Sequence, residues 1–229
     1  MSLTDLDCAR LVAAQYAGDT SPFDVWISEG HPSWRSVAWA AKVVGDHVVF
    51  VLEGSHDGYD WGRDAQFLPV WVNGAHLHAG FWANMPETWE MMKGFRAMTG
   101  APVIFCGHSL GAAHADDLAW LALQDDYDVR ALIRWGEPAP SYNSVLGGAL
   151  SVIPIRRSYI NERPAPRWPD QQDPIPALPL KIFGAKHPDQ FTPIFAGPTG
   201  DDLLRWHHFG TVAGGGGYLS MTPKAFILP

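Results

Sequence analysis

One stretch near the middle of the chain, residues 102–123, constrains the fold more than any other. An apolar run at 103–106 is followed by the glycine-containing segment 107–111 and then by a region rich in Ala and Leu. The run has the length and composition of a strand buried in a parallel sheet. The region after it has apolar positions at helical spacing: Leu110, His114, Leu118 and Leu121. The stretch therefore predicts a strand, a sharp turn and a helix, which is the repeating unit of an α/β fold.

The turn itself reads Gly107-His108-Ser109-Leu110-Gly111. Gly-x-Ser-x-Gly between a strand and a helix is the pattern of a nucleophile elbow, in which the serine occupies a strained turn. The glycines are expected because strand and helix nearly touch there. The start of the helix directs its amides and the positive end of its dipole at the place where an oxyanion would form. The alternative is a glycine-rich turn in which Ser109 only caps the helix.

Composition limits what a chain of this kind can do. Its 229 residues suffice for one large α/β domain, and neither a repeat nor a linker divides it. A net charge of −8 without a basic run disfavours nucleic acid and electrostatic docking on anionic lipid. Cys8 and Cys106 are too few for a disulfide framework, and Cys106 is interpreted as a small core residue.

The N-terminus is acidic, and no apolar run follows basic residues there. No signal peptide or membrane-spanning segment is therefore expected. A cytoplasmic location is the default expectation, with export by another route left open.

The rest of the chain is expected to supply the sheet and its covering helices. The patterns predict a helix at 4–17 capped by Thr4, a two-stranded hairpin at 36–53 with its turn at Gly45-Asp46, and a helix at 86–98. Strands are expected at 70–81, 129–135, 152–159 and 191–195, and a short helix at 142–150. The proline-rich segment 163–179 and the glycines at 214–217 are expected to be irregular.

A serine hydroxyl is a poor nucleophile unless an imidazole takes its proton, and a carboxylate must orient that imidazole. In α/β-hydrolases these groups follow one another in the order Ser, Asp, His. Asp170 and Asp173 lie in a loop after a later strand and qualify as the acid. The histidines that follow them are His187, His207 and His208.

Five motifs, in order, resemble those of the fungal-type (class 3) lipases, a branch of the α/β-hydrolase fold. They are VFVLEGSHDGYDWGRD from Val49, His78-Ala79-Gly80-Phe81, the segment GHSLG, Gly136-Glu137-Pro138, and Asp173-Pro174-Ile175-Pro176. The resemblance implies a single domain over 1–229 with a central, mostly parallel sheet flanked by helices.

The resemblance also implies residue roles. Ser109 would be the nucleophile, and Asp173 the acid, because Pro-Ile-Pro follows it as in the family's motif. His207 would be the base, with His208 as the second choice, since His207 has Phe209 two positions later. The oxyanion hole would use the backbone N–H groups of Ser55 and Leu110.

The chain departs from the family's pattern in places. Glu53 stands where arginine is usual, Ala112 follows the elbow where a third glycine is common, and residues 162–172 look like an insertion. The segment 56–67 lies where the family has its lid. It is short and polar, which favours soluble or short-chain esters.

Two further pairs of polar residues stand out in the sequence. His76 and His78 would share one face of a strand as a zinc pair, but no third ligand has a familiar spacing, so neither metal nor cofactor is expected. Asp116 and Asp117 are expected on a solvated face of the elbow helix.

The sequence thus predicts a serine hydrolase of carboxylic esters, acting through an acyl-enzyme on acylglycerols or other lipid-like esters, with transient contact at a lipid interface. Two alternatives remain open at this point. One is thioester hydrolysis or acyl transfer on the same triad, and the other is a catalytically inactive binding protein of this fold.

Overall fold

The computed structural model describes residues 2–27, 37–54, 68–162, 173–178, 184–195, 207–210 and 217–228. The predictions for Ser55, for Asp170 and for the segment 56–67 concern residues outside these ranges.

The described chain alternates between strands and helices. The helices are α1 (Asp5–Tyr16), α3 (Ala79–Trp82), α4 (Met85–Thr99), α5 (Leu110–Gln124), α6 (Val145–Leu150) and α7 (Gly217–Met221), with a 3₁₀ turn at Ile175–Ala177. The strands are β1 (Leu3–Thr4), β2 (Val25–Ile27), β3 (Trp39–Val44), β4 (His47–Leu52), β5 (Pro69–Val72), β6 (Ala75–His78), β7 (Val103–His108), β8 (Val129–Trp135), β9 (Ile155–Asn161), β10 (Phe191–Ile194) and β11 (Phe226–Leu228).

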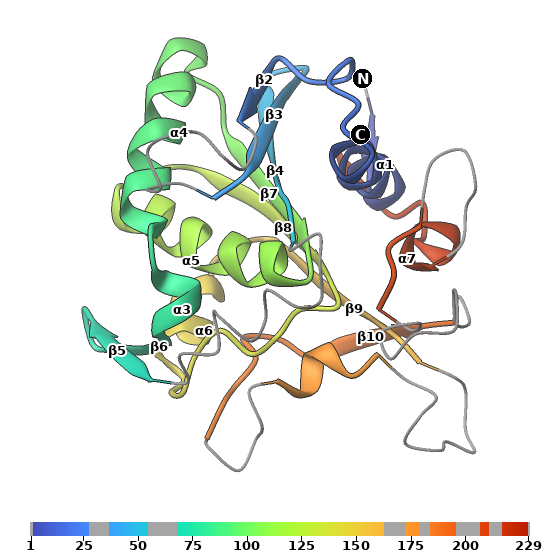
Figure 1. Ribbon diagram of the computed structural model, residues 1–229. Coiled ribbons are helices and arrows are strands. Elements are labelled where there is room, and N and C mark those ends of the chain that lie inside the picture. The colour runs from blue at the N-terminus through green and yellow to red at the C-terminus, as the bar shows by residue number, and fades with distance from the viewer. Residues whose placement is uncertain are drawn as a thin grey trace.

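A seven-stranded sheet forms the centre of the molecule, with the strand order β10-β9-β8-β7-β4-β3-β2 (Figure 1). The pairs from β10 to β4 are parallel, and β3 and β2 add to the edge in antiparallel fashion. The prediction of a mostly parallel central sheet flanked by helices is therefore confirmed. The carboxyl ends of β4, β7, β8 and β9 meet at one edge, where α/β folds place their binding groups.

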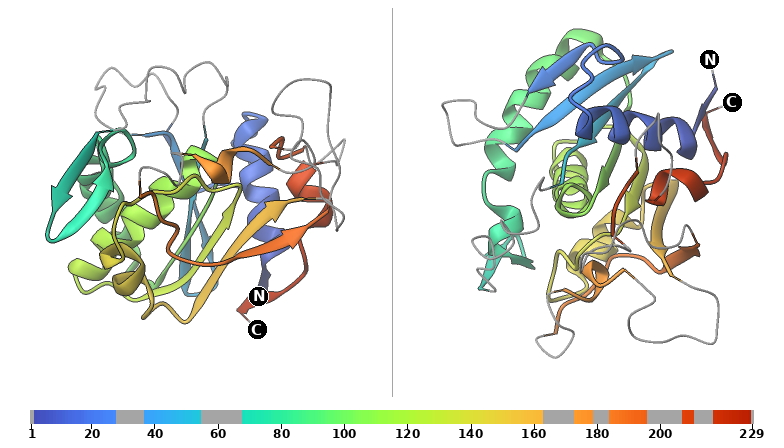
Figure 2. Two further views of the ribbon diagram at one scale, coloured as in Figure 1. Left: turned by 90° about the horizontal axis from the view of Figure 1, so that it is seen from below. Right: turned by 45° about the vertical axis from the view of Figure 1, so that its right-hand side comes forward.

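Helices cover the two faces of the sheet: α3, α4 and α5 lie on one side and α1 and α7 on the other (Figures 1 and 2). Successive side chains of a strand point to opposite faces, so a strand buried on both faces is apolar throughout. In β4, Phe50 packs in the apolar layer that contains Trp89 of α4, while Val51 packs in the layer that contains Val12 of α1. The second strand of the predicted hairpin at 36–53 owes its continuous hydrophobicity to this double burial.

The local signals at the N-terminus and in the first hairpin are confirmed. Thr4 caps α1 through a capping box with Asp7, whose backbone N–H lies 3.3 Å from Thr4 Oγ1. The predicted hairpin is β3 and β4, with Gly45 at φ +62° in the turn.

Other element predictions need correction. The predicted strand region 70–81 is two short strands, β5 and β6, which pair as a separate hairpin, and its last residues turn into α3. The predicted strand at 152–159 begins at Ile155 and runs to Asn161. The short helix α7, after the glycine run, was not predicted, and it forms because its first residues bond back to the backbone of His208 and Phe209.

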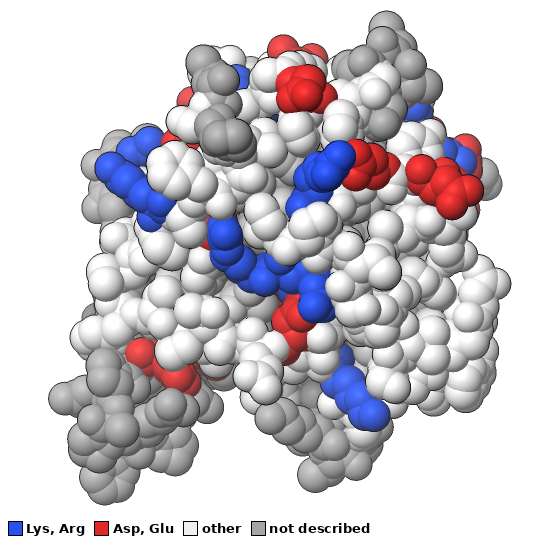
Figure 3. Space-filling model, turned by 180° about the vertical axis from the view of Figure 1, so that it is seen from behind, with Lys and Arg blue, Asp and Glu red and all other residues white. Residues whose placement is uncertain are grey.

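Charged side chains of both signs meet on the surface. On the face opposite that of Figure 1, a short band of basic side chains has acidic side chains against it (Figure 3). The described ion pairs include Arg157 with Asp5 and Arg130 with Asp128.

Candidate active site

Ser109 lies between the end of β7 and the start of α5. Its φ of 58° and ψ of −131° are a strained conformation for a residue with a side chain. The Ser109 N–H donates to the carbonyl of Trp135 at the end of β8, 2.9 Å away, which holds the turn against the neighbouring strand. Ser109 occupies the N-cap position, but its side chain makes no capping hydrogen bond. The alternative in which the hydroxyl serves as a helix cap is therefore wrong.

The two glycines of the pentapeptide are required by close approaches of the backbone. A Cβ atom on Gly107 would overlap the backbone of Gly111 and would lie 2.9 Å from Ala112 N. A Cβ atom on Gly111 would overlap the backbone at the end of β4, 2.7 Å from the carbonyl oxygen of Glu53. The elbow turn can therefore form only if the end of β7, the start of α5 and the end of β4 meet without side chains between them.

The backbone directly after β4 also packs closely against the elbow turn. A Cβ atom on Gly54 would lie 2.8 Å from Ser109 Cβ. Gly54 is the last described residue before Ser55, so the sequence-predicted oxyanion donor from this loop lies outside the described ranges. The other predicted donor, the Leu110 N–H, is at the first position of α5, where amides have no acceptor within the helix.

Asp173 and His207, which are 34 residues apart in the chain, are brought together in the interior. His207 Nδ1 lies 2.7 Å from Asp173 Oδ2, and both side chains are almost fully buried. An ionised carboxylate can only accept, so Nδ1 carries the proton and Nε2 presents a lone pair. Among the described residues, His207 Nε2 is buried and has no hydrogen-bond partner. This nitrogen is therefore available to take a proton.

The structure places the remaining late histidines elsewhere. His208 is exposed, in contrast to the buried His207. His187 donates through Nε2 to the carbonyl of Pro176 at 2.7 Å, and its Nδ1 lies 3.7 Å from a Glu137 carboxylate oxygen. Only His207, of these three residues, pairs with Asp173.

His108, the residue before Ser109, connects the elbow to His207. Its Nε2 lies 2.9 Å from the His207 carbonyl oxygen and its ring stacks on the His207 ring at 4.5 Å between centroids. The carbonyl accepts, so His108 Nδ1 accepts from the Tyr16 hydroxyl at 2.8 Å. Burial and the adjacent positive charge of an ionised His207 lower the pKa of His108 well below its usual value. His108 is thus a neutral support that holds His207 beside the elbow.

Gly136, directly after β8, lies against the pair. Its φ is +58°, and a Cβ atom there would lie 2.7 Å from Asp173 Oδ2 and 2.9 Å from His207 Cε1. The Gly-Glu-Pro motif therefore provides the space in which the carboxylate and the imidazole meet.

Tyr218 is a site residue that the sequence did not indicate. It comes from α7, is fully buried, and donates its phenolic hydrogen to Asp173 Oδ2. No motif identified Tyr218, because no helix was predicted after the glycines at 214–217. Its position becomes clear only when α7 folds back on the residues after His207.

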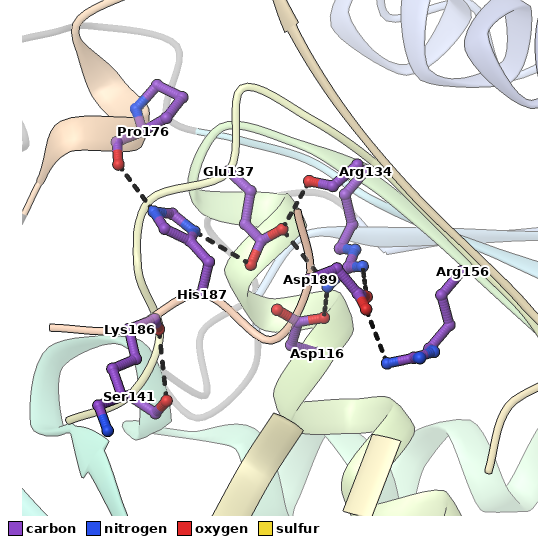
Figure 4. Close-up of polar contacts among 10 residues, drawn as sticks. Asp116, Arg134, Glu137, Ser141, Arg156, Pro176, Lys186, His187 and Asp189 are labelled. Carbon is purple, nitrogen blue, oxygen red and sulfur yellow. Dashed lines mark hydrogen bonds and ion pairs between the residues drawn. The ribbon is translucent and has the colours of Figure 1, made fainter. Parts of the chain in front are cut away.

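A second buried polar cluster surrounds Arg134 near the end of β8 (Figure 4). Arg134 pairs with Asp116 Oδ1 at 2.5 Å, with Glu137 Oε2 at 3.4 Å and with Asp189. Arg156 reaches Asp189 from the more exposed side at 2.7 Å. We refer to Asp116, Asp117, Arg134, Glu137, His187 and Asp189 as the Arg134 cluster.

The prediction of a solvated face for Asp116 and Asp117 is wrong, since neither residue has any exposed surface. That face of α5 packs over the parallel sheet, where Arg134 supplies the countercharge. Burial raises the pKa of Asp117 well above its usual value, and the charge of Glu137 adds to this shift. Burial also opposes ionisation of Glu137, but Arg134 and His187 outweigh it and lower the pKa of that residue to about 2.

The His76–His78 pair is used structurally. The His76 ring stacks on Trp71 at 4.2 Å, and His78 Nδ1 accepts from the Phe81 N–H at 3.4 Å, which starts α3. Within the described ranges, no three His, Cys, Asp or Glu side chains come together in a way that could hold a metal ion.

A scan against protein-family models found no match, and a search of curated proteins found no sequence relative. Solved structures do match. The chain is similar to a mutant form of MDLA from Penicillium cyclopium at 19% identity, over 86% of this chain and 78% of the other, with a TM-score of 0.62.

It is also similar to a triacylglyceride lipase from Rhizomucor miehei, at 20% identity over 86% and 81% of the two chains, with a TM-score of 0.59. The mono- and diacylglycerol lipase from Aspergillus oryzae matches at 19% identity over 81% and 74%, with a TM-score of 0.57. None of the described helices combines the length and apolarity needed to cross a bilayer. The resemblance seen in the five motifs is confirmed for the fold: the chain has the α/β-hydrolase architecture of the fungal lipases.

Proposed function

We propose that this protein hydrolyses carboxylic esters through an acyl-enzyme on Ser109, with His207 as the base and Asp173 as the group that orients it. One observation carries the proposal. A strained serine at the start of a helix follows His108, whose ring stacks on the buried imidazole of His207, and that imidazole has one nitrogen held by a carboxylate and the other without a described hydrogen-bond partner.

The chemistry follows from these groups. The Ser109 hydroxyl attacks the ester carbonyl carbon while His207 Nε2 takes its proton, and the carbonyl oxygen becomes an oxyanion. The Leu110 N–H and the positive end of the α5 dipole stabilise that charge. His207 then returns the proton to the departing alcohol, and a water molecule, activated by the same nitrogen, releases the acid and regenerates Ser109.

The proposed substrates are acylglycerols or other lipid-like esters. This proposal rests on the shared fold, since the similar structures include a triacylglyceride lipase and a mono- and diacylglycerol lipase. We expect turnover of short soluble esters as well, because the segment 56–67 is short and polar for a lid.

A fluorophosphonate probe tests the nucleophile. We expect covalent labelling of the wild type, loss of labelling in Ser109→Ala, and full labelling in Ser151→Ala, a matched control at an exposed serine outside the site. No labelling of the wild type would contradict the proposal and favour a binding protein.

A series of p-nitrophenyl esters of increasing chain length, run below and above their solubility limits, tests the substrate class. We expect hydrolysis across the series, with a rise above the solubility limit if a lipid interface is used. Faster turnover of acyl thioesters, or products that depend on an added alcohol, would replace ester hydrolysis by thioester hydrolysis or acyl transfer.

A further inference from the structure

From the described residues the Asp173 carboxylate accepts three hydrogen bonds, and only one of them comes from His207. The backbone N–H of Ile175 donates to Oδ1 at 2.9 Å, while His207 Nδ1 and the Tyr218 hydroxyl both donate to Oδ2. Tyr218 and His207 therefore compete for electron density on the same oxygen.

The direction of the Tyr218 hydrogen bond is fixed by its surroundings. The backbone N–H of Asn161, at the end of β9, donates to the phenolic oxygen at 3.0 Å, so the phenol must direct its own proton at Asp173. The Asn161 carbonyl in turn accepts from the Asp173 N–H at 2.8 Å. Burial and the negative charge of Asp173 raise the pKa of Tyr218 well above its usual value, so the hydroxyl remains a donor.

The helix that carries Tyr218 also holds the backbone next to His207. The Tyr218 N–H donates to the His208 carbonyl at 3.2 Å, and the Leu219 N–H donates to the Phe209 carbonyl at 2.8 Å. Gly217 has φ +51°, and a Cβ atom there would overlap this backbone. The start of α7 thus contacts both the acid and the segment that follows the base.

We propose that Tyr218 is a positioning residue that sets how strongly Asp173 attracts the proton on His207 Nδ1. This inference rests on the proposed function, in which His207 is the base. A hydrogen bond to a carboxylate withdraws charge and makes it less basic. Without the phenol, Oδ2 keeps His207 as its one side-chain donor among the described residues, so the carboxylate stabilises the imidazolium more and the base is protonated at higher pH.

The test is the pH profile of kcat/KM of the Tyr218→Phe variant, measured with a soluble ester. We expect the acid-side midpoint to move up by about half a pH unit or more. Tyr159→Phe is the matched control, because Tyr159 is also buried and donates to a buried carboxylate, Asp5, away from the site. Its acid-side midpoint should equal that of the wild type.

A second substitution gives an effect of opposite sign and keeps the residue's shape. Replacement of Tyr218 by 3-fluorotyrosine makes the phenol a stronger donor, so the acid-side midpoint should move to lower pH, while 3-fluorotyrosine at 159 should not move it. Midpoints that stay at the wild-type value in both Tyr218 variants would overturn the inference. The fluorinated variant decides the matter if Tyr218→Phe does not fold.

Proton NMR in water separates this inference from the proposed function. The proton shared by His207 and Asp173 is expected far downfield of the amides, and its shift should change in the Tyr218 variants but not in the Tyr159 variants. A wild type that hydrolyses no ester would sink the proposed function alone, whereas an unchanged resonance would sink the role of Tyr218.

Discussion

Two buried polar networks lie near the end of β8, and they differ in how completely their atoms are paired. In the network of Tyr218, Asp173 and His207, each carboxylate oxygen has a donor, and His207 Nε2 is the atom without a partner among the described residues. In the Arg134 cluster several buried atoms have no described hydrogen-bond partner: Asp116 Oδ2, both Asp117 oxygens and Arg134 Nε, while Glu137 Oε1 and His187 Nδ1 face each other only at 3.7 Å.

The difference indicates different tasks. A network that satisfies every group except one lone pair holds that lone pair in a fixed place, as proton transfer requires. The Arg134 cluster joins α5, the end of β8 and the segment 184–195 through charge, and its unpaired atoms make it costly. Chemistry should therefore depend on the first network and stability on the second.

The largest effect expected is that of His207→Ala, which removes the proposed base. We expect kcat/KM for a p-nitrophenyl ester to fall about 10⁴-fold or more, while His208→Ala stays within about threefold of the wild type. Loss of turnover in His208→Ala alone would show that the wrong histidine was assigned.

Next comes Arg134→Met, which leaves the acidic side chains of the Arg134 cluster without their countercharge. Breaking a buried ion pair on one side costs about 3–5 kcal/mol. The free energy of unfolding in urea should fall by that amount, and the kcat of the folded protein should change little. Arg156→Met is the matched control, because Arg156 is partly exposed and its ion pair among the described residues is with Asp189, so a loss of about 1 kcal/mol or less is expected. Equal losses of unfolding free energy in the two variants would contradict the assignment of Arg134 as the main countercharge of the cluster.

Gly136→Ala tests the space beside the Asp173–His207 pair. The added Cβ would lie 2.7 Å from Asp173 Oδ2, and a displaced acid should lower kcat/KM about 100-fold. Gly74→Ala is the control for backbone strain, since Gly74 also has positive φ but nothing lies within 4 Å of an added Cβ. If the two variants lose the same activity, close packing at Gly136 is not what matters.

The smallest effect expected is a pH-dependent gain in the free energy of unfolding from Asp117→Asn. Because the pKa of Asp117 is raised in the folded state, its stabilising contribution is present below about pH 4 and is lost as the pH rises. The amide never ionises, so the variant should match the wild type near pH 4 and exceed it at pH 8 by on the order of 1 kcal/mol.

Urea unfolding at both pH values measures the Asp117 effect. Asp128→Asn, at a half-exposed ion pair on the surface, should follow the wild type throughout. A variant that is less stable than the wild type at pH 8 would mean that ionised Asp117 has a partner.

Much of the sheet could be predicted because it depends on local or strictly periodic signals. A continuous apolar run such as 48–52 must be buried on both faces, and Thr4 with Asp7 satisfies the first amides of a helix within one turn. The region 70–81 was predicted only as strand, because a short apolar run shows neither the turn that divides it into β5 and β6 nor the sheet that it joins.

By itself the sequence determined the elbow, because glycines at 107 and 111 and a strained Ser109 are requirements of a single turn. Only the tertiary structure decided which partners that turn meets. Asp173 and His207 are 34 residues apart, Tyr218 lies 45 residues after Asp173, and His207 is 99 residues from His108. The same holds for Asp116 and Asp117, whose charge suggests solvent until packing of α5 on the sheet buries them. Contacts of this range depend on which faces of distant elements meet, and no local pattern along a chain encodes that choice.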